Sequence, residues 1–126
     1  MASVKLSQEK REQLQELQER MMELSNKQKQ TVFQKQQKEK EKRQNVFSLH
    51  EIGELPDQTK TYKAVGKMFV LRPKTELEDE LIAANDSLDA DVASLQKSNE
   101  YFESKLAEVQ GGLRDLIGSA VGNQSK

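Results

Sequence analysis

Few side chains in this sequence are suited to catalysis or metal binding. His50 is the single histidine, and there is no cysteine. A zinc site or an acid–base centre needs several ligand or proton-transfer groups held together. Without cysteine the chain has neither disulfides nor a thiolate nucleophile. We interpret His50 as an ordinary polar residue.

Three aspartates, Asp86, Asp89 and Asp91, stand close together and raise the question of a calcium site. They lack the alternate spacing and the glycine of an EF-hand loop, and the pattern around them is helical. The sequence also contains no glycine-rich phosphate loop and no nucleophile elbow. We therefore predict no catalytic, cofactor-binding or metal-binding residue, and a protein that is not an enzyme.

The stretch from Lys27 to Arg43 contains seven basic residues against Glu39 and Glu41. A DNA-binding basic region precedes its leucine zipper, whereas here the leucines come first, and arginine, the usual base reader, is nearly absent. The formal net charge of −1 gives no general attraction to nucleic acid or acidic membranes. We interpret the stretch as a solvated helix face; the alternative is a docking surface for an acidic partner.

Composition restricts the fold. Of 126 residues, 34% are hydrophobic and 33% are charged, with no tryptophan, which is too polar for a broad globular core. A disordered chain, or a helical chain with a narrow apolar seam, remains. The first residues lack the apolar core of a signal peptide, and no stretch approaches the roughly 20 apolar residues of a membrane span. We expect a soluble, cytoplasmic protein.

Periodicity favours the helical class and begins in a first helix predicted at residues 7–45. This segment has no glycine or proline and consists mainly of good helix formers. Its first leucines and Met21 are spaced three or four residues apart, as in a coiled-coil seam. The seam then turns polar, so we expect the helix to persist with weaker packing. The seam positions are Leu14, Leu17, Met21, Leu24, Gln28, Thr31, Lys35, Lys38 and Lys42.

A second helix is predicted at residues 75–118, opened by a capping-box pattern at Thr75 and Glu78. Apolar positions then alternate in steps of four and three, with one extra four-residue step, a stutter, before Val92. We expect Gly111-Gly112 to interrupt the helix, and residues 119–126 to form a flexible tail. The seam positions are Leu77, Leu81, Ala84, Leu88, Val92, Leu95, Asn99, Phe102, Leu106, Val109, Leu113, Leu116 and Ala120.

Residues 46–74 link the two helices and form the predicted oligomerisation hub. Ser48 and Glu51 fit another capping box, which predicts a short helix at residues 48–55. Pro56 then favours a turn.

A β-hairpin follows this turn. Thr61–Val65 and Lys67–Leu71 are β-rich runs on either side of Gly66, and Pro73 ends the second run. An isolated hairpin is marginal in water and exposes two strand edges, so we predict that other subunits cover it. The alternative is that the hairpin packs onto the chain's own helices. The predicted interface residues are Tyr62, Val65, Gly66, Met68, Phe69, Val70 and Leu71.

Together these elements predict a mainly α fold in one domain over residues 1–126. Two helices of similar length, joined by a hairpin, are expected to fold back on each other as an antiparallel coiled coil. Leu14–Leu24 would then face roughly Phe102–Leu116, with both chain termini at one tip and the hairpin at the other.

The segment Thr61–Leu71, with Leu55–Lys60 before it, resembles the central signature of β-type prefoldin subunits, which consist of a long helix, a hairpin and a second long helix. Gly66–Leu71 is most similar to the eukaryotic members. The plan covers almost the whole chain, whereas the specific residues cover about Leu55–Arg72. Gly111-Gly112 departs from what we expect of the family, and puts the straightness of the second helix in question.

The resemblance implies a hetero-hexamer of two α-type and four β-type subunits, with the hairpins assembled into β-barrels at a hub. It implies an ATP-independent chaperone, a holdase, that captures unfolded actin and tubulin and delivers them to the cytosolic chaperonin. The acidic partner considered above for the basic stretch would then be a chaperonin. A structural or tethering coiled coil is the alternative function; a nucleic-acid-binding coiled coil is disfavoured by the charge and the order of segments.

Under this resemblance, clients bind the free tip of the coiled coil, where seam residues spend part of their time unpaired. Each contact is weak, so affinity would come from several arms acting together. The alternative is that these residues simply pair with each other. The candidates are Leu6, Leu14, Leu17, Leu113, Leu116 and Ile117.

Overall fold

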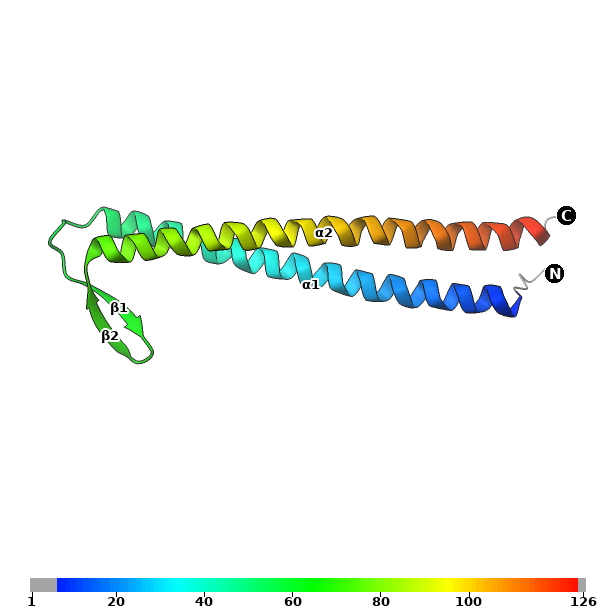
Figure 1. Ribbon diagram of the computed structural model, residues 1–126, viewed down its shortest axis with the longest axis horizontal. Helices are drawn as coiled ribbons and strands as arrows, with labels where there is room; N and C mark the ends of the chain where they lie inside the picture. The colour runs from blue at the N-terminus through cyan, green and yellow to red at the C-terminus, as the bar shows by residue number, and fades with distance from the viewer. Residues whose placement is uncertain (1–6, 125–126) are drawn as a thin grey trace. The chain divides into compact units, whose positions relative to one another are not determined.

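The computed structural model describes the backbone of residues 7–124 and the side chains of residues 7–119. The predicted fold class, two long helices joined by a single antiparallel β-hairpin, is confirmed. The elements follow in the order α1 (Gln8–Gly53), β1 (Thr61–Val65), β2 (Met68–Arg72) and α2 (Lys74–Gln124) (Figure 1). Within the described residues, no helix is apolar over a stretch long enough to cross a membrane.

The chain divides into two compact units, and both long helices contribute to each. Unit 1 contains α1 up to Phe33 and α2 from Gln96 onward. Unit 2 contains residues 34–95, and therefore the hairpin with the adjoining parts of both helices.

Helix α1 begins at a side-chain cap and ends at a glycine. The Lys10 backbone N–H donates to Ser7 Oγ at 3.2 Å, which satisfies one of the free donors of the first turn. The helix then continues without a break to Gly53, so the predicted end at residue 45 and the separate helix at 48–55 were wrong. No glycine or proline stands near residue 45, and Ser48 lies half-buried within the helix instead of capping one.

Helix α2 begins at Lys74, where the Pro73 carbonyl accepts the Leu77 N–H at 3.1 Å. It runs through Gly111 and Gly112 to Gln124, so the predicted interruption and the start of a tail at residue 119 were wrong. A helix-interior glycine costs only about 1 kcal/mol relative to alanine, and packing against a partner helix supplies most helical stability in proteins. Residues 125–126 lie outside the described part of the chain.

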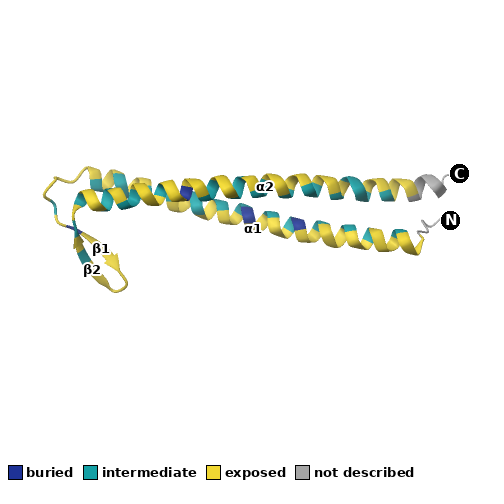
Figure 2. Cartoon of the chain, viewed as in Figure 1, coloured by how far each residue is buried: buried dark blue, intermediate teal, exposed yellow. Residues whose placement is uncertain are grey.

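In unit 1 the two helix segments pack through the predicted seam. Leu24 is only 2% exposed, and Gln28 Nε2 donates to Glu103 Oε1 of α2 at 3.4 Å. The buried and half-buried positions recur along both segments at the heptad spacing (Figure 2). Thr31 is buried as well, and its hydroxyl donates to the Lys27 carbonyl one turn earlier at 2.8 Å.

In unit 2 the seam continues in register, and its polar positions on α1 are half-buried, as predicted for Lys35, Lys38 and Lys42. On α2, however, Asn85 and not Ala84 is the half-buried residue between Leu81 and Leu88. The extra four-residue step is therefore still present, but it lies between Leu81 and Asn85 and not directly before Val92. The sequence analysis did not assign Asn85 to the seam because it is polar, but its side chain has a polar partner on α1.

The hairpin pairs Thr61 with Arg72 at its base and Val65 with Met68 beside the turn. Gly66 has a φ of 60°, and no other described residue has a positive φ. A two-residue turn with positive φ only at its first position is a type II′ turn, which favours glycine there. Lys67 consequently belongs to the turn and not to the second strand, where the sequence analysis placed it.

Candidate interaction surfaces

The two faces of the hairpin differ in character. Because directly opposed residues of an antiparallel pair lie on the same face, the register puts Tyr62, Ala64, Phe69 and Leu71 on one face. The other face carries Thr61, Lys63, Val65, Met68, Val70 and Arg72.

The polar side chains on this second face tie the hairpin to α2. Lys63 Nζ donates to Glu80 Oε2 at 2.8 Å, and Arg72 Nη1 lies 2.9 Å from Glu76 Oε1 and 3.7 Å from Glu80 Oε1. The hydrogen bond from Lys63 lowers the pKa of the Glu80 carboxyl below its ordinary value. Thr61 is buried at the hairpin base, and its hydroxyl donates to the Arg72 carbonyl. These contacts anchor the base of the second face to α2, while Val65 and Met68 beside the turn stay exposed.

The first face, which we call the apolar hairpin face, consists of Tyr62, Ala64, Phe69 and Leu71 and is exposed throughout. Phe69 is 76% exposed. An aromatic ring exposed to this degree, among other exposed apolar groups on a two-stranded sheet, is a feature of surfaces that partner chains cover. Figure 1 shows the strands extending away from the adjoining helix segments of unit 2.

The remaining predicted interface residues lie elsewhere on the hairpin. Val65 and Met68 are exposed beside the turn, on the second face, and Gly66 forms the turn itself. Val70 is half-buried on the same face. Of the apolar hairpin face, Tyr62 lines a groove with Ile52 and Leu77 of the helices, whereas Phe69 and Leu71 stay exposed away from it. The interface itself stays a prediction.

Lys74 joins the end of α1 to the start of α2, a role that the sequence analysis missed. Its ammonium donates to the Leu55 carbonyl at 2.8 Å and to the Gly53 carbonyl at 3.4 Å, and it lies 3.7 Å from Asp57 Oδ1. Its side chain is only 11% exposed. A cation at the carbonyl end of a helix satisfies free acceptors and opposes the helix dipole. The sequence shows only a lysine beside Pro73. The carbonyls that it contacts lie about 20 residues away, so no local pattern indicated this role.

The predicted client-binding residues in unit 1 are mostly paired. Leu14, Leu17, Leu113 and Leu116 are half-buried. Leu17, Gly112 and Leu116 line one groove, and a methyl group on Gly112 would meet the Leu17 δ-carbons at 3.7 and 3.8 Å. Ile117 is 51% exposed. Leu6 lies outside the described residues.

Three further apolar side chains of unit 1 are exposed that sequence reasoning did not select. Met22, Phe33 and Tyr101 are each more than half exposed. All three lie off the heptad seam, and this is the signal that could have identified them: a large apolar residue at a solvent-facing position of an otherwise polar helix.

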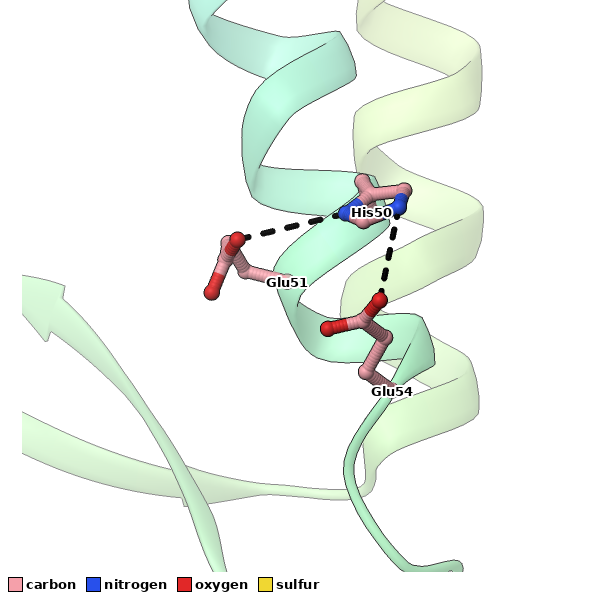
Figure 3. Close-up of side chains that lie close together, drawn as sticks. All are labelled: His50, Glu51 and Glu54. Atoms are coloured by element: carbon pink, nitrogen blue, oxygen red, sulfur yellow. Dashed lines mark ion pairs between the residues drawn. The ribbon is translucent and has the colours of Figure 1, made fainter.

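His50 has two carboxylate neighbours at the end of α1 (Figure 3). Its Nδ1 lies 3.9 Å from Glu51 Oε1 and its Nε2 lies 3.4 Å from Glu54 Oε1. Within the described residues these three side chains are close enough to offer a metal ion three ligands. All three are strongly exposed, and the carboxylates contact opposite ring nitrogens. One ion binds one nitrogen, so the arrangement suits ordinary surface ion pairs better than a metal centre.

Two of the aspartates considered for calcium have cross-helix partners instead. Asp91 Oδ2 lies 3.4 Å from Lys38 Nζ, and Asp89 forms an ion pair with Lys42. Lys38 and Lys42 of the basic stretch are thus paired with acidic residues of α2. The stretch is therefore not only a solvated helix face, because part of it contacts the partner helix.

The comparisons with known proteins agree with this architecture. The family profile described as prefoldin subunit matches residues 8–120. Prefoldin subunit 1 of Arabidopsis thaliana is 44% identical over 102 residues, covering 81% of this chain and 80% of the relative. Prefoldin subunit beta of Archaeoglobus fulgidus is 28% identical over 110 residues, covering 87% and 89%. The crystal structure of the prefoldin beta subunit from Thermococcus strain KS-1 superimposes with a TM-score of 0.77 at 23% identity, covering 91% of this chain and 96% of that one.

The chain therefore belongs to the prefoldin subunit family, and it is a β-type member with one hairpin between two helices. The resemblance stated from Thr61–Leu71 is confirmed, and the likeness of Gly66–Leu71 to eukaryotic members agrees with relatives named prefoldin subunit 1. Prefoldin subunits are chaperones and are not known as enzymes, and family membership implies other prefoldin subunits as partners.

Proposed function

We propose that this chain is a β-type subunit of a cytoplasmic hetero-hexamer that binds non-native proteins without ATP. Clients such as actin and tubulin would be passed to the cytosolic chaperonin. The hexamer would contain α-type and β-type subunits joined through their hairpins. The observation that carries the proposal is the apolar hairpin face, because it presents exposed aromatic and aliphatic groups while ion pairs connect the opposite face to α2.

The anchoring contacts support a role in assembly. Ion pairs of Lys63 and Arg72 with Glu76 and Glu80 connect the strands to α2, and together they favour one orientation of the apolar hairpin face within unit 2. A surface ordered before binding loses less conformational entropy when a partner covers it. Strands from neighbouring subunits would also satisfy the two open edges of the hairpin.

The exposed apolar residues of unit 1 support client binding. Ile117, Met22, Phe33 and Tyr101 can meet an apolar client segment without breaking helix contacts, whereas Leu17 and Leu116 would first have to separate from the seam. Burial of one such side chain is worth about 1.5–3 kcal/mol at most, before ordering costs. Several arms acting together would therefore be needed for useful affinity.

A test is to change three of the exposed residues together, as Met22→Ser, Phe33→Ser and Ile117→Ser, in the assembled complex. We expect weaker suppression of client aggregation, because the substitutions remove accessible apolar area, while the native mass stays that of the complex. The matched control changes three exposed polar residues of the same unit, Gln18→Ser, Gln30→Ser and Gln110→Ser. Equal activity of both variants and the natural complex would exclude these side chains as the client-binding surface.

A further inference from the structure

The seam of unit 2 contains a cross-helix polar cluster. Asn45 Nδ2 donates to Asn85 Oδ1 at 2.9 Å, and both side chains are half-buried. Lys42 forms an ion pair with Asp89 and Lys38 with Asp91. These six residues form three consecutive polar contacts between α1 and α2, and we call them the polar cluster.

Such contacts are not the most stable choice for a helix–helix seam. Leucine at Asn45 and Asn85 would gain apolar burial and remove the desolvation of two amides. Exposed and half-exposed ion pairs contribute at most about 1 kcal/mol each. A polar pair inside an apolar seam is instead known to select register and partner at the expense of stability, so we compare the pairings that compete with the observed one.

The first competitor is a shifted register. A heptad seam matches itself again after seven residues, a displacement of about 10 Å along the helix. After a shift of one heptad, the residue opposite Asn45 becomes Val92 or Glu78 instead of Asn85. Lys42 then faces Gln96 or Ile82 instead of Asp89. The shift to Val92 leaves Asn45 facing an apolar residue, whereas the shift to Glu78 gives Asn45 a carboxylate acceptor but places Lys42 against Ile82. Both shifts lose the amide pair of Asn45 with Asn85 and the ion pair of Lys42 with Asp89.

The second competitor is a second copy of α1. Its leucine-bearing first half would pair well with itself, but an in-register parallel pair would place Lys35, Lys38 and Lys42 against their own counterparts. Like charges at facing seam positions are unfavourable. The acidic partners of Lys38 and Lys42 lie instead on α2 of the same chain.

We propose that the polar cluster determines which helix pairs with α1 and in which register. It selects α2 of the same chain, in a single register, as the partner of α1, and it rejects both the shifted register and a second copy of α1. The polar cluster acts within one subunit, and so its role is independent of the proposed client binding.

The test uses the absence of cysteine in the natural sequence. Gln34 and Ser94 line one groove in unit 2 and are both exposed, so the pair Gln34→Cys and Ser94→Cys reports the native register through a short bismaleimide crosslink. In this background we replace the asparagines, as Asn45→Leu with Asn85→Leu. We expect a higher thermal midpoint, but an intrachain crosslink yield reduced about twofold or more, with crosslinked dimers appearing.

Two further variants separate pairing from stability. Lys42→Asp, which faces Asp89 with a like charge, should lower the intrachain yield, and adding Asp89→Lys should restore it. Asn99→Leu is the matched control, because the Asn99 Oδ1 atom is buried without a hydrogen-bond partner among the described residues. This change should raise the thermal midpoint and leave the yield unchanged. An undiminished yield of monomeric crosslink in the double-leucine variant, or failure of the charge exchange to restore the yield, would overturn the proposal.

Discussion

Lys74 and Glu80 illustrate how single side chains position the hairpin. Lys74 donates a hydrogen bond to the Leu55 carbonyl at the end of α1, and Glu80 forms ion pairs with Lys63 of β1 and Arg72 of β2. Neither role could be predicted from the sequence, because each depends on partners eight to about twenty residues away and not on a local pattern. The apolar residues of the strands were predictable, since their type alone favours an extended, covered segment.

Replacing Lys74 with methionine should weaken the junction of the helices. The change keeps a long side chain but removes the ammonium that donates to the Leu55 and Gly53 carbonyls at the end of α1. We expect the free energy of unfolding to fall by about 1–2 kcal/mol, measured by urea denaturation. Lys60→Met, at an exposed position of the same linker, is the control; equal stability of the two variants would refute the capping role.

The link between Lys63 and Glu80 should make hairpin anchoring sensitive to acid. Because the folded-state pKa of Glu80 is below its ordinary value of 4.5, the pair stabilises the fold fully above that value. The contribution disappears as the pH falls through the lowered pKa. Carboxyl resonances followed by NMR should show the pKa of Glu80 rising in Lys63→Gln and staying low in Lys67→Gln. An unchanged pKa in Lys63→Gln would contradict the assigned contact.

The elements were predictable where their periodicity was strong. Seam positions of α1 from Leu14 to Lys42 are at least half-buried, because the 3–4 spacing of a coiled coil is a local signal. Errors arose where local signals competed with packing. The capping pattern at Ser48 yielded to continuation of α1, and the helix-breaking tendency of Gly111-Gly112 yielded to contact with α1 in unit 1.

The glycine pair nevertheless leaves α2 less stable than it could be. A methyl group at Gly111 meets no atom within 4 Å, and one at Gly112 makes only ordinary contact with Leu17. Gly111→Ala with Gly112→Ala should therefore raise helix stability by about 1–2 kcal/mol in total. Amide hydrogen exchange around residue 112 should slow accordingly. Faster exchange would mean that the glycines relieve a steric conflict.

At the scale of the whole molecule, many large apolar side chains of the described residues are exposed. Few of the described residues are deeply buried, and the apolar hairpin face is exposed. Obligate assembly was predicted from the lack of any core to cover the hairpin, and it stays a prediction. Which face of the hairpin stays exposed could not be predicted from the sequence, because it depends on the pairing register and on the ion pairs of Lys63 and Arg72.

The central claim is that the apolar hairpin face joins this chain to other prefoldin subunits. The most direct measurement is the native mass and composition of complexes purified with the tagged chain from its own cells. The natural chain is compared with a Phe69→Ser, Leu71→Ser variant, and Lys40→Ser serves as a control. We predict a hetero-hexamer for the natural chain and the control, and a free subunit for the variant. A hexamer that survives in the variant, or a natural chain recovered only as a homodimer or with folded membrane or cytoskeletal partners, would contradict the account.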